Sequence, residues 1–127
     1  MLIHIQDLKR KNYLDTLQIQ EGLRNQVLKN NNGNHLILVE HDHVYTLGKS
    51  ANSSNVLNRS CEIIQTQRGG DVTYHGPGQL VAYPIINLKK KKIGVKTYVE
   101  MIEKLISNIL FDYGLEPHVP ILSLIHI

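Results

Sequence analysis

The apolar positions of this chain predict a helix near each end. One stripe recurs at helical spacing over residues 13–28 and a broader one over residues 95–113, which is the pattern of helices that bury one face. Asn12 and Asp15, three residues apart, form a capping pattern at the start of the first helix. Gly114 closes the second helix.

Short strand-like runs fill the stretch between the two helices. Gly33, in an asparagine-rich run, suits the left-handed turn that ends the first helix, and the polar residues 48–60 predict an exposed loop. Pro84 interrupts the last apolar run, so we expect an edge, a bulge or a bend there. Strands clustered between helices are the α+β pattern. We expect strands over residues 1–5, 36–39, 44–47, from 63 into the following glycine-rich segment, and over 80–86.

Composition is that of an ordinary single domain. The chain has 127 residues, 42% hydrophobic and 20% charged, which is enough for one core. No apolar run approaches the roughly 18 residues that cross a bilayer, and the N-terminus, with Asp7 and no basic region, resembles neither a signal nor a transit peptide. The single cysteine, Cys61, fits a reducing compartment. We therefore expect a cytoplasmic protein without a membrane segment.

The positive charge of the chain is modest and local. The net charge is +3 with a pI near 9.0, and it is concentrated in the four lysines at 89–92, with Lys96 close behind. We favour a solvated turn between two elements. A landing patch for an acidic protein or nucleic acid is the alternative. Because arginine repeats and interleaved aromatic residues are missing, nucleic acid is not the leading partner.

The most distinctive segment has four glycines and a proline around polar side chains. Glycine accepts φ > 0 and lets a ligand approach the main chain, and successive N–H groups in such turns can form a nest for an oxyanion. A cation, hydroxyls and an imidazole at its edge indicate a binding loop rather than a connector. The segment reads Arg68-Gly69-Gly70-Asp71-Val72-Thr73-Tyr74-His75-Gly76-Pro77-Gly78-Gln79.

Four side chains of this segment are candidates for recognition. Arg68 can grip a carboxylate, a phosphate or a carbonyl oxygen, with a surface salt bridge as the alternative. In an extended segment Thr73 and His75 point to one face and Tyr74 to the other, so either Thr73 and His75 share a pocket with Tyr74 packed behind, or the reverse. His75 can orient a substrate or shuttle a proton, although a structural hydrogen bond to a carbonyl is its plainer role.

Other chemistry finds less support in the sequence. His41 and His43, with His75, invite a metal site, but no cysteine or further carboxylate stands at a matching distance, and we expect none. The segment that follows them adds Gly48, which can take a left-handed conformation. Cys61 has no activating neighbour and is expected to be an ordinary thiol. The glycine-rich segment is neither a P-loop nor a dinucleotide fingerprint, and no nucleophile elbow occurs.

Two segments carry a resemblance to a known family. Residues 68–81, followed by Tyr83-Pro84-Ile85, closely resemble the signature of the lipoate-pathway octanoyltransferases. Glu40-His41, followed by Tyr45-Thr46-Leu47-Gly48, resembles the upstream segment of the same family. Two matched segments in the right order make the resemblance specific, and it runs from about the first strand to Gly114.

The resemblance implies a fold and an activity. The fold would be that of the biotin and lipoate ligases, an α+β domain with a mixed sheet flanked by helices. The activity would be transfer of an octanoyl group from octanoyl-acyl carrier protein to a lysine of lipoyl domains, those of 2-oxoacid dehydrogenase complexes and of the glycine cleavage H protein. No cofactor is implied, and we expect a monomer.

The resemblance also implies a set of substrate-binding residues. Gly69 and Gly70 would let the main chain pass close to the acyl chain, Val72 would line the acyl groove, and Thr73 and His75, with Arg68, would orient the pocket mouth. The whole matching stretch is Arg68, Gly69, Gly70, Asp71, Val72, Thr73, Tyr74 and His75.

For catalysis the sequence departs from the family. Its members use a cysteine nucleophile that forms an acyl thioester and a lysine that stabilises the thiolate, and both lie in the later half of those enzymes. Cys61 precedes the glycine-rich motif and the lysines at 89–92 match no catalytic lysine, so we assign no catalytic residue. The chain ends within an apolar run, and an unpaired strand-like end is unusual. We expect residues 1–127 to form one incomplete, inactive domain, truncated at its C-terminus, with a non-native tail after about residue 117.

Three alternatives stay open. An ATP-dependent lipoate or biotin ligase shares the fold, but the ending His75-Gly76-Pro77-Gly78 favours the transferase. A non-catalytic module that binds an acyl carrier or a lipoyl domain would suit the missing nucleophile. A histidine metal protein would retain stoichiometric metal after exhaustive dialysis.

Overall fold

A computed structural model of the chain describes residues 2–30, 33–58 and 60–117. The chain divides into two compact units, Met1–Asn87 and Leu88–Ile127, and each is described by itself. Whether the chain is one domain, as its sequence predicts, therefore stays a prediction.

Within its described residues, the first unit holds two mixed three-stranded sheets. In each sheet the central strand pairs parallel with one neighbour and antiparallel with the other, which confirms the α+β class with mixed sheets. The first sheet has the order β1 (His4–Arg10), β2 (His35–Glu40), β6 (Val81–Ile85), and the second has the order β4 (Glu62–Gln65), β3 (Val44–Leu47), β5 (Val72–His75). A short 3₁₀ helix, η1 (Ser53–Asn55), lies between β3 and β4.

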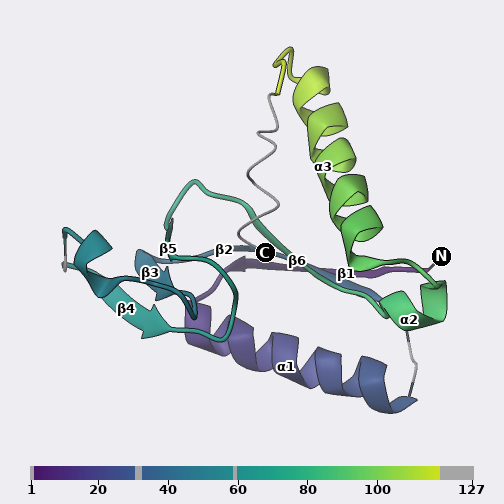
Figure 1. The fold of residues 1–127 in the computed structure, drawn as a ribbon, viewed down its shortest axis with the longest axis horizontal. Helices are drawn as coiled ribbons and strands as arrows, with labels where there is room; N and C mark the ends of the chain where they lie inside the picture. The colour runs from purple at the N-terminus through teal and green to yellow at the C-terminus, as the bar shows by residue number, and fades with distance from the viewer. Residues whose placement is uncertain (1, 31–32, 59, 118–127) are drawn as a thin grey trace. The chain divides into compact units, whose positions relative to one another are not determined.

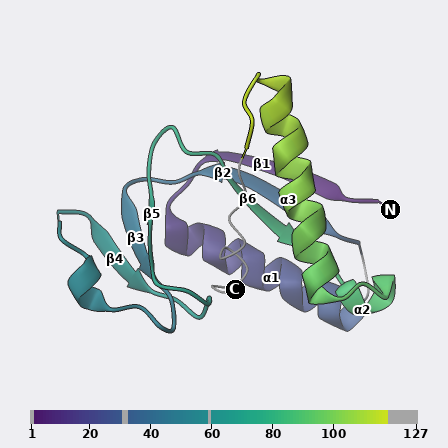
Figure 2. The ribbon, with the colours of Figure 1, turned by 45° about the horizontal axis from the view of Figure 1, so that its top comes forward.

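Helix α1 (Tyr13–Asn30) begins where its cap predicts. The Asp15 N–H donates to Asn12 Oδ1 at 2.8 Å, and Asn12 Nδ2 donates back to the Asp15 carboxylate at 2.8 Å. Gly33, beyond the end of α1, has φ +73°, so both end signals are confirmed. The helix runs beside the strands of the first unit (Figures 1 and 2).

The same helix contributes to two separate cores. Near its start it packs on the second sheet, and further along it packs on the first, so one amphipathic stripe serves both sheets. The first core joins Tyr13 and Leu17 to Val44 and Ile64, and the second joins Ile19 and Leu23 to Ile37 and Val39.

Two strands differ in extent from the prediction. Strand β1 continues to Arg10 instead of ending at residue 5, because its pairing with β2 resumes after an irregularity between Asp7 and Arg10, where Lys9 has φ +56°. Strand β4 ends at Gln65 instead of entering the glycine-rich segment, because its parallel partner β3 ends at Leu47, whose carbonyl accepts from both the N–H and the hydroxyl of Thr66, at 2.8 and 2.9 Å.

Residues 41–43 and 76–80 carry the chain between the two sheets. The first passage joins β2 to β3, and the second joins β5 to β6. Strand β6 lies at the edge of its sheet, as Pro84 predicts. The glycine-rich segment therefore spans the loop before β5, β5 itself, and the second passage.

The second unit contains α2 (Leu88–Lys91) and α3 (Val95–Asp112). Helix α3 ends in a Schellman motif: the Leu115 N–H donates to Leu110 O at 3.0 Å, the Gly114 N–H donates to Phe111 O at 2.9 Å, and Gly114 has φ +73°. The lysines at 89–92 lie in and just after α2 and are exposed. Of the helices that the structure describes, none has the length and apolarity to cross a bilayer.

Candidate functional site

The loop before β5 is held against the end of β3 by the guanidinium of Arg68. Its Nη2 donates to the Thr46 carbonyl at 2.6 Å, to Thr46 Oγ1 at 3.0 Å and to the Asp71 carbonyl at 2.8 Å, and its Nη1 donates to Gly69 O at 2.8 Å. Thr46 is completely buried. A planar group with several donors suits this arrangement. The guanidinium thus fixes the shape of the loop.

Glycines allow the same loop to lie close to β3. Gly70 has φ +81°, a conformation that favours glycine. Gly48 serves differently from our expectation, since its φ is not positive. A Cβ on Gly48 would meet Gly70 O and would lie 2.7 Å from Gly69 O. A glycine is therefore required at position 48 because two main-chain segments approach each other closely there. The residues next to Gly48 in the sequence do not reveal this approach.

Asp71 ties a second loop to this segment. Its carboxylate accepts hydrogen bonds from the Asn52 N–H at 3.0 Å and from Asn55 Nδ2 at 2.6 Å, while Ser50 Oγ donates to Gly70 O at 3.0 Å. The bond from Asn52 is the main reason that the pKa of Asp71 lies below its usual value. Asp71, which lies within the predicted substrate-binding stretch, therefore holds the loop of Asn52 and Asn55 against that stretch.

Strand β5 turns its side chains to two different environments, as its extended form predicts. Tyr74 is 42% exposed, lies 2.5 Å from His43 Nδ1 through its hydroxyl, and contacts the ring of Tyr45. Val72 and Thr73 pair with β3, and both are half-buried. The ring of His75, also half-buried, belongs instead to a cluster of aromatic rings.

This aromatic cluster consists of Tyr13, His41, His75 and Tyr83. His41 is completely buried and lies at its centre, with ring centroids 5.4 Å from Tyr13, 5.7 Å from His75 and 5.8 Å from Tyr83. Tyr13 also stacks on His75, nearly parallel, at 6.2 Å. The sequence pointed to both histidines, but nothing in it indicated that Tyr13 and Tyr83 complete the group.

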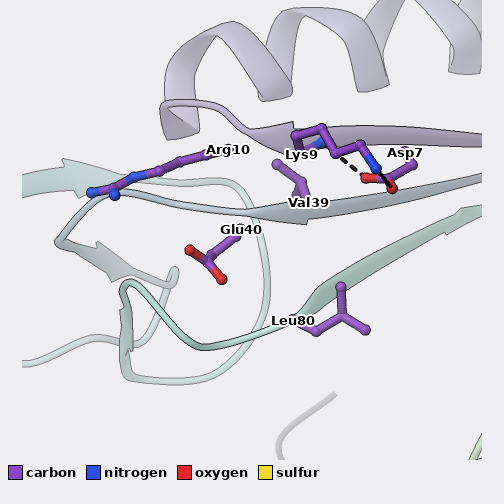
Figure 3. Close-up of a pocket in the computed structure, with 6 residues that line it drawn as sticks. All are labelled: Asp7, Lys9, Arg10, Val39, Glu40 and Leu80. Carbon is purple, nitrogen blue, oxygen red and sulfur yellow. Dashed lines mark hydrogen bonds and ion pairs between the residues drawn. The ribbon is translucent and has the colours of Figure 1, made fainter.

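Among the described residues of the first unit, two hollows are lined in part by residues of the two resembling segments, and a third, of about 340 Å³, is lined by Leu17, Gln20, Glu21, Arg24, Pro84, Ile85 and Ile86. The first, of about 460 Å³, lies on the Tyr74 side of β5 and is lined by His43, Tyr45, Asn58, Ser60, Cys61 and Tyr74. The second, of about 330 Å³, is lined by Asp7, Lys9, Arg10, Val39, Glu40 and Leu80. In Figure 3 the side chain of Lys9 meets Asp7, and Arg10 pairs with Asp42 at 2.6 Å. Each cation of the second hollow thus has a carboxylate partner, and none of the residues that line this hollow belongs to the 68–75 stretch.

Among the described residues, no three histidine, cysteine, aspartate or glutamate side chains are arranged to hold a metal ion. His41 has no nitrogen left for a ligand bond, because Lys11 O and the Tyr83 hydroxyl occupy both. Cys61 is half-buried and unpaired, at the edge of the larger hollow.

The two sequence segments that resemble the octanoyltransferases meet in space. Thr46 and Gly48 of the upstream segment contact Arg68, Gly69 and Gly70 of the signature, and His41 contacts His75. The glycine-rich loop, the Arg68 guanidinium that holds it and the aromatic cluster form one continuous region of the first unit. We call this region the signature site.

Comparisons with known proteins identify the family of this chain. Residues 12–119 match the family described as the lipoyl protein ligase A/B catalytic domain. Similar curated proteins are the octanoyltransferases of Solibacter usitatus, 42% identical over 88% of this chain, Alkaliphilus metalliredigens, 41% over 87%, and Pelobacter propionicus, 38% over 87%. The chain spans about half the length of these relatives, 54%, 54% and 53% respectively. The match covers the signature site and most of both units, and the chain therefore belongs to the lipoyl protein ligase A/B catalytic domain family.

Proposed function

We propose that this chain supplies the acyl-binding part of an octanoyltransferase. The complete enzyme would move an octanoyl group from octanoyl-acyl carrier protein to a lysine of a lipoyl domain, in 2-oxoacid dehydrogenase complexes and in the glycine cleavage H protein. The names of the similar proteins support the reaction class. The observation that carries the proposal is the meeting of the two resembling segments in the signature site.

Within this site, some residues of the 68–75 stretch would contact the acyl group and others would hold the loop in shape. Gly69 and Gly70 would offer main chain to the acyl group without a Cβ in the way, and Val72 and Thr73 would line its path. Arg68 and Asp71 would keep the loop in shape, because their polar atoms are bonded to other parts of the chain. Specificity would thus rest on a rigid main-chain framework rather than on a charged side chain that grips the ligand.

His75 is the side chain of the stretch best suited to meet the reacting end of the acyl group. Its Nδ1 lies 2.6 Å from Gln79 Oε1. Gln79 Nε2 donates to the Tyr74 carbonyl at 3.4 Å, which orients the amide so that its oxygen faces the imidazole, and Nδ1 of His75 therefore carries the proton. Its Nε2 has no hydrogen bond within the residues that the structure describes. That atom is the one that a ligand would meet.

The reaction would proceed by two acyl transfers. A cysteine thiolate attacks the thioester carbonyl of the carrier, the carbon–sulfur bond to the carrier breaks, and the carrier thiolate takes up a proton. The lysine amine then attacks the acyl-enzyme thioester, an amide forms, and the enzyme thiol is released. By the family resemblance, the nucleophile and its partner lysine belong to the later part of the enzyme, and we assign neither role to Cys61 or to the lysines at 89–92.

An acyl-transfer assay tests the proposal. A protein in which this chain is continued by the later half found in its relatives should transfer octanoate from octanoyl-carrier protein to a lipoyl domain without ATP. The 127-residue chain alone should not. Transfer by the short chain that disappears in Cys61→Ser would overturn the assignment of the nucleophile.

The same assay separates the competing functions. Pyrophosphate release that depends on ATP and on a free fatty acid would identify a ligase. Tight binding of the carrier without transfer, in the longer protein, would identify a binding module. Either result would contradict the proposed transferase.

A further inference from the structure

His41 is placed where it cannot contact a substrate, and yet it is held in a single state. Its side chain is completely buried. Its Nδ1 lies 2.8 Å from the Lys11 carbonyl, which can only accept, so Nδ1 carries the proton. In the neutral ring Nε2 is then an acceptor, and it lies 2.9 Å from the Tyr83 hydroxyl. Two hydrogen bonds therefore fix both the tautomer and the plane of the imidazole.

Tyr83 is a reliable donor to this ring. Burial is the main reason that the pKa of Tyr83 lies above its usual value, so the hydroxyl stays protonated and donates to Nε2. Burial also lowers the pKa of His41, and the neighbouring His75 lowers it further, against the opposing effects of the Lys11 carbonyl and Asp42. The pair is thus a neutral tyrosine bonded to a neutral imidazole.

The buried pair forms part of the surroundings of His75. The rings of His41 and His75 meet edge to face, with an interplanar angle of 61°, while Tyr13 lies nearly parallel to His75, at 11°. Gln79 holds Nδ1 of His75. The His75 ring is therefore oriented by contacts with Tyr13, His41 and Gln79, and the contact through His41 depends on a bond to Tyr83.

We propose that His41 and Tyr83 are positioning residues that hold the imidazole of His75 in the orientation that presents its Nε2 to the acyl substrate. The pair reaches the reaction only through His75 and touches no substrate itself. The identity of the substrate depends on the proposed function, whereas the orientation of the His75 ring by its neighbours depends on the contacts alone.

The test uses Tyr83→Phe, which removes one hydroxyl and keeps the ring that packs in the core. Tyr98→Phe is the matched control, because Tyr98 is a half-buried tyrosine on α3 that is not one of the four clustered rings. The stacked pair His4 and His35, with centroids 5.4 Å apart, serves as an internal reference.

Nitrogen-15 spectra of the histidine rings of the 127-residue chain give the first readout. In the wild type at neutral pH, His41 and His75 should both show the Nδ1–H tautomer. In Tyr83→Phe the ring signals of His75 should shift or broaden, while those of His4 and His35 stay in place. Tyr98→Phe should reproduce the wild-type spectrum. Unchanged His75 signals in Tyr83→Phe would overturn the proposal.

Steady-state octanoyl transfer by the longer protein gives the second readout. Tyr83→Phe should lower kcat/KM by up to about tenfold per folded molecule, which is the fold-change that the loss of one hydrogen bond corresponds to, and Tyr98→Phe should leave it unchanged. A merely structural role would lower the melting temperature without changing kcat/KM per folded molecule.

The two readouts separate the proposal from the function on which it rests. A shift of the His75 signals with unchanged kinetics would overturn the positioning role. A shift of those signals, in a wild-type protein that transfers no octanoate at all, would support the holding of the ring and contradict the proposed transferase.

Discussion

Replacing Gly48 with alanine should loosen the signature site at its base. The added Cβ would lie 2.7 Å from Gly69 O and 2.8 Å from the Gly70 carbonyl carbon, and both are main-chain atoms that cannot rotate away. Such overpacking costs about 1–3 kcal/mol. The displaced loop would also weaken the bonds from Gly48 N to Asp71 O and from Lys49 N to Arg68 O, at 3.1 and 3.0 Å, each worth about 1 kcal/mol.

We therefore expect Gly48→Ala to lower the free energy of unfolding by about 2–4 kcal/mol. Thermal unfolding followed by circular dichroism measures this, with a drop in melting temperature of about 4 °C for each kcal/mol. Gly22→Ala is the matched control. Gly22 lies on the exposed side of α1 with nothing within 4 Å of an added Cβ, so this change should stabilise the helix by about 0.8 kcal/mol. A Gly48→Ala protein as stable as the wild type would refute the close-approach argument.

Four further changes test other parts of the structure. Arg68→Lys keeps the charge, but a lysine cannot bridge the carbonyls of Thr46, Gly69 and Asp71. Urea unfolding should therefore show a free energy of unfolding lower by about 2–3 kcal/mol. A decrease below about 0.5 kcal/mol would contradict the holding role of the guanidinium. Asn12→Ala should cost about 1 kcal/mol through the lost cap, a cost that would be absent if the cap did not form. The folded-state pKa of His41 lies below its unfolded value of 6.5, so its contribution to stability is present above pH 6.5 and is lost as pH falls toward the folded pKa. The difference in melting temperature between wild type and His41→Asn should therefore shrink as pH falls through that window. A difference that stays constant with pH would contradict the effect of burial on this pKa. Replacing the lysines at 89–92 with glutamate should slow association with an acidic carrier protein, most at low salt, and an equal stopped-flow rate would exclude steering by this run.

The features that the sequence predicted well are local ones. Asn12 and Asp15 are three residues apart and satisfy each other at the helix start. The stop at Gly114 likewise depends on the last turn of its own helix, and Pro84 limits its strand to an edge whatever lies on the other side. In each case the deciding partner is within a few residues, so a pattern of residue types is sufficient.

The features that the sequence did not predict depend on partners far along the chain. Arg68 and Thr46 are 22 residues apart, and His41 and Tyr83 are 42 apart. Which carbonyl a guanidinium meets, or which hydroxyl completes a buried imidazole, is decided by strand pairing and not by neighbouring residues. For the same reason Gly48 was expected to supply a left-handed turn, although its role is to admit another segment of main chain.

The two passages between the sheets have a mechanical consequence. His41 begins one passage and His75 immediately precedes the other, and their rings are in contact. If the two sheets were to move apart, both passages would act as hinges. The distance between these two rings would then change first. A ligand bound beside β5, such as the proposed acyl group, would oppose this movement, so that both sheets would respond to its binding.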